Sequence, residues 1–157
     1  MFAQATPGYA KDVRVGVIDI QAAVTGTNEW KKEFASFKTK FQKEKLSIAA
    51  KEKNLKKLIE DLNKKSMVLS PELKNKKEEA LIKKKKNFER YVQDKNEDFA
   101  KSEKAITSII LKKMVKIVKD LGESKNFTMI LERKIGLYFD QSVDLTALAI
   151  RTYNKTK

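Results

Sequence analysis

The sequence contains no cysteine and no histidine among its 157 residues. Without these side chains the protein has no disulfide, no thiol nucleophile, no common zinc site and no histidine base. Glycine and proline are scarce, with five and two residues, and no Gly-x-x-x-x-Gly-Lys phosphate loop occurs. Because no serine stands in a nucleophile elbow either, we expect no enzyme and no cofactor.

Long apolar runs are also absent, so the sequence predicts no membrane-spanning helix. We expect residues 1–12 to form a flexible tail because they are small and polar and include Pro7 and Gly8. Within this tail, residues 2–5 (Phe-Ala-Gln-Ala) have the small-x-small pattern that ends a secretory signal. A tail without that origin explains the segment equally well.

Charge is abundant: 36% of the residues are charged, and the formal net charge is +14. A typical globular domain carries roughly 25% charged residues. A chain of this kind is either disordered or elongated with thin apolar seams, and the seams described next favour elongation. The positive field would attract nucleic acid, an anionic membrane surface or acidic proteins.

The chain begins with a predicted strand, because Val13, Val15 and Val17 alternate with other residues and Ile18 and Ile20 follow. Residues 25–28 (Thr-Gly-Thr-Asn) break this alternation. The third or fourth of these residues could cap the helix that follows.

From residue 29 the spacing of apolar residues changes from every second position to every seventh position. One seam of apolar residues repeats six times: Phe34, Phe41, Ile48, Leu55, Leu62 and Leu69. The second seam is half polar: Trp30, Phe37, Glu44, Lys51, Leu58 and Lys65. We therefore predict a long helix that packs on a partner helix through a thin contact.

Residues 70–72 (Ser-Pro-Glu) stop this helix and start another, which places the tip of a helical hairpin near residues 66–71. The second helix is predicted to run to Leu121, with Gly122 as its left-handed stop. The two helices, residues 28–122, form the predicted arm, and no interior glycine or proline breaks either one.

After the arm, the alternation of residues 127–131 and the apolar residues 135–139 predict a β-hairpin. Asp144 then starts a short helix with Leu145, Leu148, Ala149 and Tyr153 on one face. The fold class is therefore mainly α with a small β head. The predicted head is discontinuous and comprises residues 13–27 and 123–157. Because so few residues cannot form a stable core alone, we expect the head to be stabilised by oligomerisation.

The excess charge lies on the arm, where residues 28–121 carry 27 Lys and Arg against 15 Asp and Glu. The densest run is Lys83, Lys84, Lys85 and Lys86. A solvated helix surface explains this run as well as an anion-attracting tip does. Asp19, by contrast, lies at a boundary within the predicted head, where capping or turn formation is enough to explain an aspartate.

Both ends of the chain carry distinctive patterns. The opening pattern is residues 13–21 (Val-Arg-Val-Gly-Val-Ile-Asp-Ile-Gln), followed by the charged hairpin. The closing pattern is more specific: Ile130 and Leu131, then Tyr138 to Asp140, then Asp144 to Thr146, then Ile150, Tyr153 and Asn154. With these patterns the chain resembles the Skp/OmpH family of periplasmic chaperones. The resemblance covers residues 13–154, although any charged coiled coil would resemble the arm.

The resemblance implies a jellyfish-shaped homotrimer in the periplasm, with the secretory signal removed. An intersubunit β-barrel would hold the trimer together through these strand residues: Val13, Val15, Val17, Phe127, Met129, Leu131, Leu137 and Phe139. Three arms would enclose a basic cavity. The implied activity is that of an ATP-independent holdase for unfolded outer-membrane proteins.

We expect the lysine run at residues 83–86 to steer these clients into the cavity, with Trp30, Phe37 and Phe88 as candidate apolar contacts. For each aromatic residue, packing within the hairpin is the favoured alternative. A prefoldin-like chaperone fits less well, because that family has its strands between the two long helices. A nucleic-acid-binding coiled coil is suggested by charge alone, although Arg is scarce and no specific nucleic acid is expected. A purely structural coiled-coil spacer is the third alternative.

Overall fold

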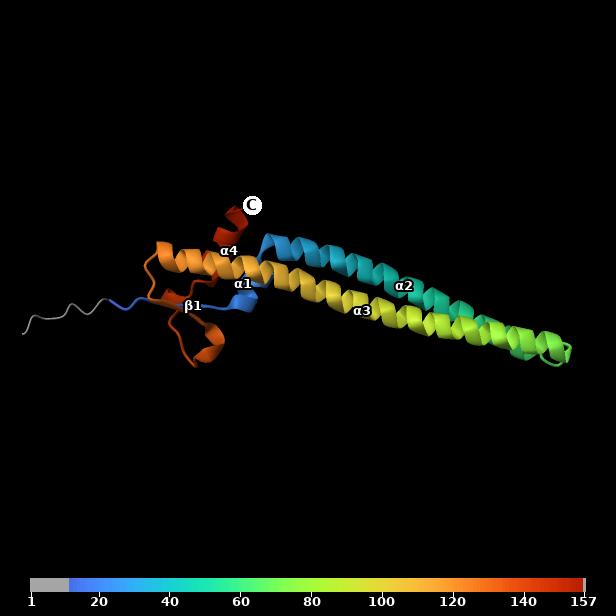
Figure 1. Ribbon diagram of the computed structural model, residues 1–157. Coiled ribbons are helices and arrows are strands. Elements are labelled where there is room, and N and C mark those ends of the chain that lie inside the picture. The colour runs from blue at the N-terminus through green and yellow to red at the C-terminus, as the bar shows by residue number, and fades with distance from the viewer. Residues whose placement is uncertain (1–11, 157) are drawn as a thin grey trace, which may run out of the picture. The chain divides into compact units, whose positions relative to one another are not determined.

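The structure is a computed structural model that describes residues 12–156. The predicted tail therefore lies outside the described residues, except for Asp12. The elements in chain order are β1 (Val15–Ile18), α1 (Ile20–Gly26), α2 (Asn28–Lys65), α3 (Pro71–Ser124), β2 (Met129–Glu132), the 3-10 turns η1 (Arg133–Ile135) and η2 (Gln141–Val143), and α4 (Thr146–Lys155) (Figure 1). A mainly helical chain with a small sheet is thus confirmed.

The chain divides into two compact units. We call residues 12–31 and 107–156 the sheet unit and residues 32–106 the hairpin unit. Helices α2 and α3 contribute to both. None of the helices in the described range combines the length and the apolar character that crossing a bilayer requires.

The sheet unit contains a two-stranded parallel sheet of β1 and β2. Val15 pairs with Met129 and Val17 pairs with Leu131. Parallel strands need a long crossover connection, and here α1, α2 and α3 together form it. The strand before the helical hairpin therefore pairs with a strand after it, which brings the two segments of the predicted discontinuous head together.

The predicted β-hairpin at residues 127–139 is wrong for this chain. The strand β2 pairs with β1, while η1 and an unpaired loop replace the second strand, so that neither Leu137 nor Phe139 is in a strand. The ring of Phe139 folds back onto Gly136, where any added Cβ would collide with it. This contact turns the segment, and Leu137 and Tyr138 remain exposed.

The predicted first strand is also shorter than expected. It begins at Val15 rather than Val13, and it ends at Ile18 because Asp19 starts a helix. The carboxylate of Asp19 accepts a hydrogen bond from the backbone N–H of Ala22 at 2.8 Å, which confirms its capping role. The sequence analysis did not predict this short helix, α1.

Two helix boundaries further along need correction. Helix α3 continues through Gly122 to Ser124, and the left-handed residue is Asn126, with a φ of 55°. Asparagine tolerates this conformation because its short polar side chain hydrogen-bonds locally. Helix α4 begins at Thr146, and its N-cap is Leu145 rather than Asp144, although the carboxylate of Asp144 still accepts a hydrogen bond from the N–H of Thr146 at 2.8 Å.

All buried residues of the described chain belong to the sheet unit. Four of them lie on one face of α3 at spacings of three or four residues: Ile110, Met114, Ile117 and Leu121. They share the core with residues from β1, α1 and α4: Val17, Ile18, Ala23, Val24, Leu145, Ala149 and Tyr153. The sheet unit therefore holds the hydrophobic core.

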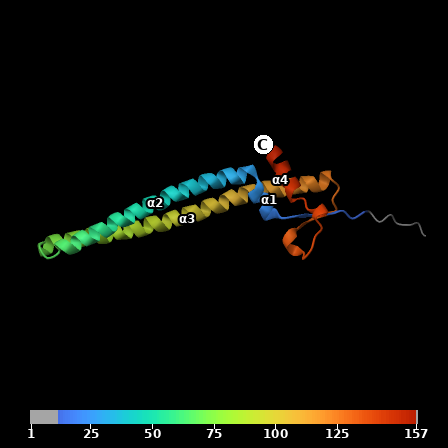
Figure 2. The same ribbon diagram turned by 180° about the vertical axis from the view of Figure 1, so that it is seen from behind.

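In the hairpin unit, the segments of α2 and α3 run side by side in opposite directions (Figures 1 and 2). Helix α2 ends at Lys65 and α3 begins at Pro71. The side chain of Ser70 caps α3 by accepting a hydrogen bond from the N–H of Leu73 at 3.3 Å. No residue between 32 and 106 is buried, so the two helices contact each other only through half-exposed side chains.

Candidate functional site

The hairpin unit contains an aromatic cluster where both seams of α2 are apolar. The ring of Phe37 stacks on those of Phe34 and Phe41, with centroids 5.7 and 6.2 Å apart. The ring of Phe99 on α3 meets Phe37 and Phe41 edge-on, with centroids at 5.8 and 5.1 Å. These contacts give Phe37 a packing role within the hairpin.

A polar stretch follows where Glu44 replaces an apolar residue in the second seam. The hydroxyl of Tyr91 donates a hydrogen bond to Glu44, and this bond raises the pKa of Tyr91 above its ordinary value. The ammonium groups of Lys51 and Lys95 lie 5.1 and 5.8 Å from the centroid of the Tyr91 ring. Here hydrogen bonding and cation–π attraction replace apolar packing between the helices.

Two hollows lie between the helices in the distal half of the hairpin unit. One has a volume of about 330 Å³, and the residues that line it are Leu58, Asp61, Leu62, Lys65, Leu69, Lys77, Ala80, Leu81 and Lys84. The other has a volume of about 440 Å³ and is lined by Lys51, Asn54, Leu55, Leu58, Lys84, Asn87, Phe88 and Tyr91. Because Leu58 and Lys84 line both hollows, we treat them as one feature and call it the distal groove.

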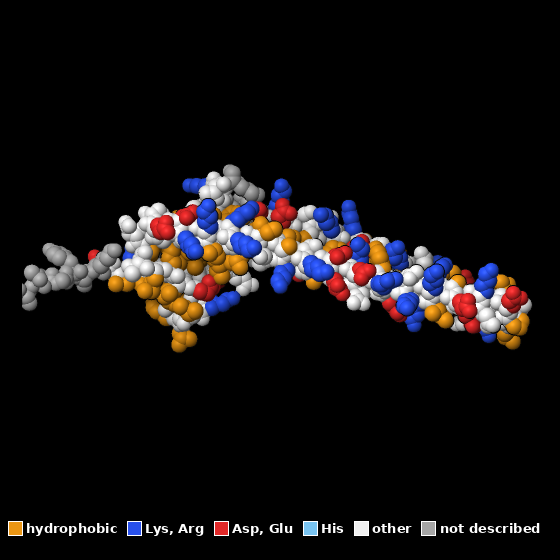
Figure 3. Space-filling view, viewed as in Figure 1, with side chains coloured by type: hydrophobic (Ala, Val, Ile, Leu, Met, Phe, Trp, Pro, Cys, Tyr) orange, Lys and Arg blue, Asp and Glu red, His pale blue; other side chains and the backbone are white. Residues whose placement is uncertain are grey.

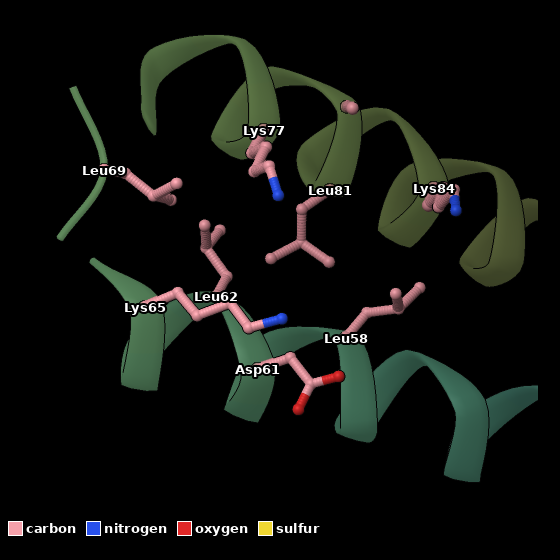
Figure 4. Close-up of a pocket in the computed structure, with 9 residues that line it drawn as sticks. Leu58, Asp61, Leu62, Lys65, Leu69, Lys77, Leu81 and Lys84 are labelled. Atoms are coloured by element: carbon pink, nitrogen blue, oxygen red, sulfur yellow. The ribbon is translucent and has the colours of Figure 1, made fainter. Parts of the chain in front are cut away.

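The chemistry of the distal groove is apolar in the middle and basic at its margins. Figure 4 shows Leu62 of α2 and Leu81 of α3 pointing toward each other across the first hollow. The side chains of Lys65 and Lys77 reach over the same space (Figure 4). Asp61 is the only acidic residue that lines either hollow.

The distal groove exists because lysines occupy seam positions. Lys51 and Lys65 stand where the second seam of α2 would need apolar residues. A lysine keeps its ammonium group in water, so it fills the space between two helices poorly. Leu58, which stands between them in the same seam, consequently remains 41% exposed.

The lysine run at residues 83–86 is exposed along its whole length. Of its four residues, Lys84 alone lines the distal groove. Lys85 lies 4.0 Å from Glu89, which is a weak surface ion pair. At the tip, the side chains of Met67 and Val68 are 95% and 83% exposed.

The sheet unit exposes a second apolar surface, visible as the orange side chains over this unit in Figure 3. The most exposed large apolar side chains of the sheet unit are Leu137, Tyr138, Val13, Ile135 and Ile109. Isolated exposed apolar residues are ordinary, but apolar side chains that gather on one face, as in Figure 3, indicate an interaction surface. Val17, by contrast, is 1% exposed and belongs to the core of its own chain.

A hydrogen-bonded network in the sheet unit joins α2, α3 and α4. Glu29 accepts one bond from the Tyr153 hydroxyl at 2.7 Å and another from the Lys113 ammonium at 2.8 Å. Burial and the bond to Glu29 together raise the pKa of Tyr153 above its ordinary value. Tyr153 therefore stays protonated and donates its hydrogen bond at any physiological pH.

The structure brings only some of the predicted site residues together. Phe88 and Lys84 line the distal groove, whereas Phe37 packs in the aromatic cluster and Trp30 belongs to the sheet unit. Phe127 precedes β2 and lies under the guanidinium of Arg14. Within the described residues, no group of acidic side chains is arranged to hold a metal ion.

Sequence reasoning missed most of the distal groove. Leu62 was assigned to the seam, and Lys65, Lys77 and Leu81 were not proposed as site residues. The signal was nonetheless present, because a lysine at a seam position predicts an unfilled interface.

Comparison with known proteins adds a family and a fold. Residues 14–153 match the family model described as outer membrane protein (OmpH-like). The chain is similar to a crystal structure of a candidate outer membrane chaperone (OmpH-like) from Caulobacter crescentus CB15. The TM-score is 0.85 and the identity 16%, over 100% of this chain and 92% of that chain. At this identity the similarity establishes the fold alone. A search of the curated proteins finds no match.

Proposed function

The chain belongs to the OmpH-like family of outer membrane proteins, and from that premise we propose that it is a holdase chaperone of the periplasm. Its clients would be unfolded outer-membrane proteins, which it keeps soluble without ATP. The similar Caulobacter crescentus structure, described as a candidate outer membrane chaperone, supports this proposal at the level of fold.

The observation that carries the proposal is the incompletely buried seam of the hairpin unit. Residues 32–106 contain no buried residue, although the seam repeats an apolar residue every seven positions. Part of the seam's apolar surface therefore remains accessible for weak, reversible contacts with apolar segments of a client. A holdase needs such contacts, because a single strong site would restrict it to one client.

Electrostatic attraction would supply the first encounter. Residues 64–86 carry nine lysines against three glutamates. Such a field acts on an acidic client over a Debye length of about 8 Å at physiological salt, and more strongly at low salt. The same field, beside the exposed Met67 and Val68, would also draw the tip toward an anionic membrane surface.

Oligomerisation is the second part of the proposal. The exposed apolar surface of the sheet unit, with Leu137 and Tyr138, suits contact with further copies of the chain. We propose a homotrimer held together by this surface and by residues near β1 and β2. Native mass spectrometry should give three chains, with a formal charge near three times +14. A monomer or a dimer would refute this part.

Aggregation of an unfolded outer-membrane protein, diluted from urea, tests the activity. We expect the full chain to suppress light scattering equally with and without ATP. Charge reversal of Lys83 to Lys86 together should weaken suppression at low salt and have less effect at high salt. The proposal fails if the wild-type chain does not suppress aggregation. Unchanged suppression by the reversed variant would refute the steering step, and tight binding to random duplex DNA at physiological salt would favour a nucleic-acid role.

A further inference from the structure

The distal groove is long enough to hold a short piece of extended chain. Its lining on α2 runs from Lys51 to Lys65. At 1.5 Å per residue this segment spans about 21 Å. An extended strand rises about 3.3 Å per residue, so about six residues would cover that length.

The volume of the groove suits the side chains on one face of an extended segment. The two hollows measure about 330 and 440 Å³. An extended segment of about six residues directs every second side chain to one face, so only about three side chains must enter the hollows.

The lining selects the type of segment. Leu58, Leu62 and Leu81 offer apolar contact in the middle of the groove, and the Phe88 ring extends it. The lysines at the margins, opposed by one aspartate, favour carboxylates. They come from both helices: Lys51, Lys65, Lys77 and Lys84. The complement of this surface has apolar side chains on one face and carboxylates on the other.

We propose that the distal groove binds an extended client segment of about six residues in which apolar and acidic side chains alternate. The apolar side chains would enter the two hollows, and the carboxylates would lie near the lysine ammonium groups. This inference rests on the proposed holdase function and deepens it. It locates one point of client contact and the type of segment bound there, whereas the proposed function alone requires only weak contacts spread along the seam.

The experiment uses the full chain and three fluorescein-labelled synthetic peptides of eight residues. The first alternates Leu and Asp, the second alternates Leu and Lys, and the third alternates Ser and Asp. Fluorescence anisotropy at physiological salt gives each dissociation constant. We expect the Leu–Asp peptide to bind about tenfold more tightly than either of the others, because only it matches both the floor and the margins.

Two matched pairs of variants locate the binding. Lys84→Glu and Lys57→Glu make the same charge change within the hairpin unit, but only Lys84 lines the groove, and Lys57 is an exposed lysine outside the run at residues 83–86. Leu58→Asn and Leu46→Asn remove the same side chain from α2, and Leu46 is 72% exposed outside the groove. We expect the groove variants to weaken binding of the Leu–Asp peptide about fivefold and the control variants less than twofold. Circular dichroism checks that all four variants remain equally helical.

Several outcomes would overturn the inference. Equal weakening by Lys84→Glu and Lys57→Glu would mean that the peptide is held by diffuse electrostatic attraction. Equal binding of the Ser–Asp peptide would mean that the apolar floor of the groove is irrelevant. Binding to vesicles of anionic phospholipid without binding to the Leu–Asp peptide would identify a lipid as the occupant.

The aggregation assay separates this failure from failure of the proposed function. A wild-type chain that suppresses aggregation, with the Lys84→Glu and Lys57→Glu variants equally active, would refute the groove alone. A chain that binds the Leu–Asp peptide in the groove yet suppresses no aggregation would refute the holdase role and support the groove.

Discussion

Replacing Tyr153 by phenylalanine should loosen the sheet unit through a single hydrogen bond. The Tyr153 hydroxyl is buried with its residue, which is 3% exposed, and it donates to Glu29 at 2.7 Å. A hydrogen bond to a charged group contributes about 1.5–3 kcal/mol. Glu29 keeps its bond to Lys113 and some contact with water, because its side chain is 14% exposed. We therefore expect Tyr153→Phe to cost about 1.5 kcal/mol, at the low end of this range.

Urea unfolding followed by circular dichroism, at one fixed protein concentration, measures this cost. A double-mutant cycle with Glu29→Ala, which removes the acceptor, isolates the pair, and we expect a coupling of about 1 kcal/mol between the two positions. Hydrogen exchange of α4 should also become faster, because Tyr153 joins this helix to Glu29 of α2. A cost below about 0.3 kcal/mol, or costs that simply add, would show that this hydrogen bond contributes little to the fold.

Two further predictions concern other contacts. The pKa of Asp144 lies below its ordinary value, first because of its hydrogen bond with Thr146 and also because of the nearby Arg133. The Asp144 carboxylate therefore stabilises the fold above about pH 4, and this stabilisation is lost as the pH falls through the folded-state pKa. Asp144→Asn should therefore cost about 1 kcal/mol at pH 7 and progressively less below pH 4 in thermal unfolding scans; a cost that does not change with pH would contradict this. Phe99→Ala should destabilise the hairpin unit by about 2 kcal/mol, less than the value for a fully buried phenylalanine, because its ring is only half-buried against Phe37 and Phe41. Urea unfolding checks this against Leu46→Ala, which should change stability by less than about 0.5 kcal/mol.

Long helices, in which the apolar pattern repeats many times, were predictable from the sequence, whereas the shortest elements were not. The seam from Phe34 to Leu62 repeats often enough to identify α2 from its period alone. Helix α1 has only seven residues, and its apolar residues continue the alternation of β1. The carboxylate of Asp19 decides the local structure there, because it caps the helix.

The failed β-hairpin has a different cause. Alternation of apolar residues indicates that a segment can be extended, but it does not supply a strand to pair with. In the chain, β2 pairs with β1, which lies more than a hundred positions earlier. That pairing leaves residues 137–139 without a strand partner, and the contact of Phe139 with Gly136 then fixes the turn.

The candidate site was only partly predictable. Lysine content and the apolar seam indicated the hairpin, and Phe88 and Lys84 were named from it. The hollows themselves depend on which residues face each other across two helices. Lys77 and Leu81 of α3 oppose Leu62 and Lys65 of α2, and this register follows from the length of the tip rather than from either helix alone.

The parallel pairing of β1 with β2 also has a consequence for folding. Every contact between these strands joins residues separated by more than a hundred positions, so the sheet has a very high contact order. Closing so long a loop is entropically unfavourable until the hairpin has formed. Packing of Phe37 against Phe99 shortens the part of the loop that is still open. The helices should therefore form first and the sheet last. Destabilising the aromatic cluster of the hairpin unit should consequently slow the formation of the sheet.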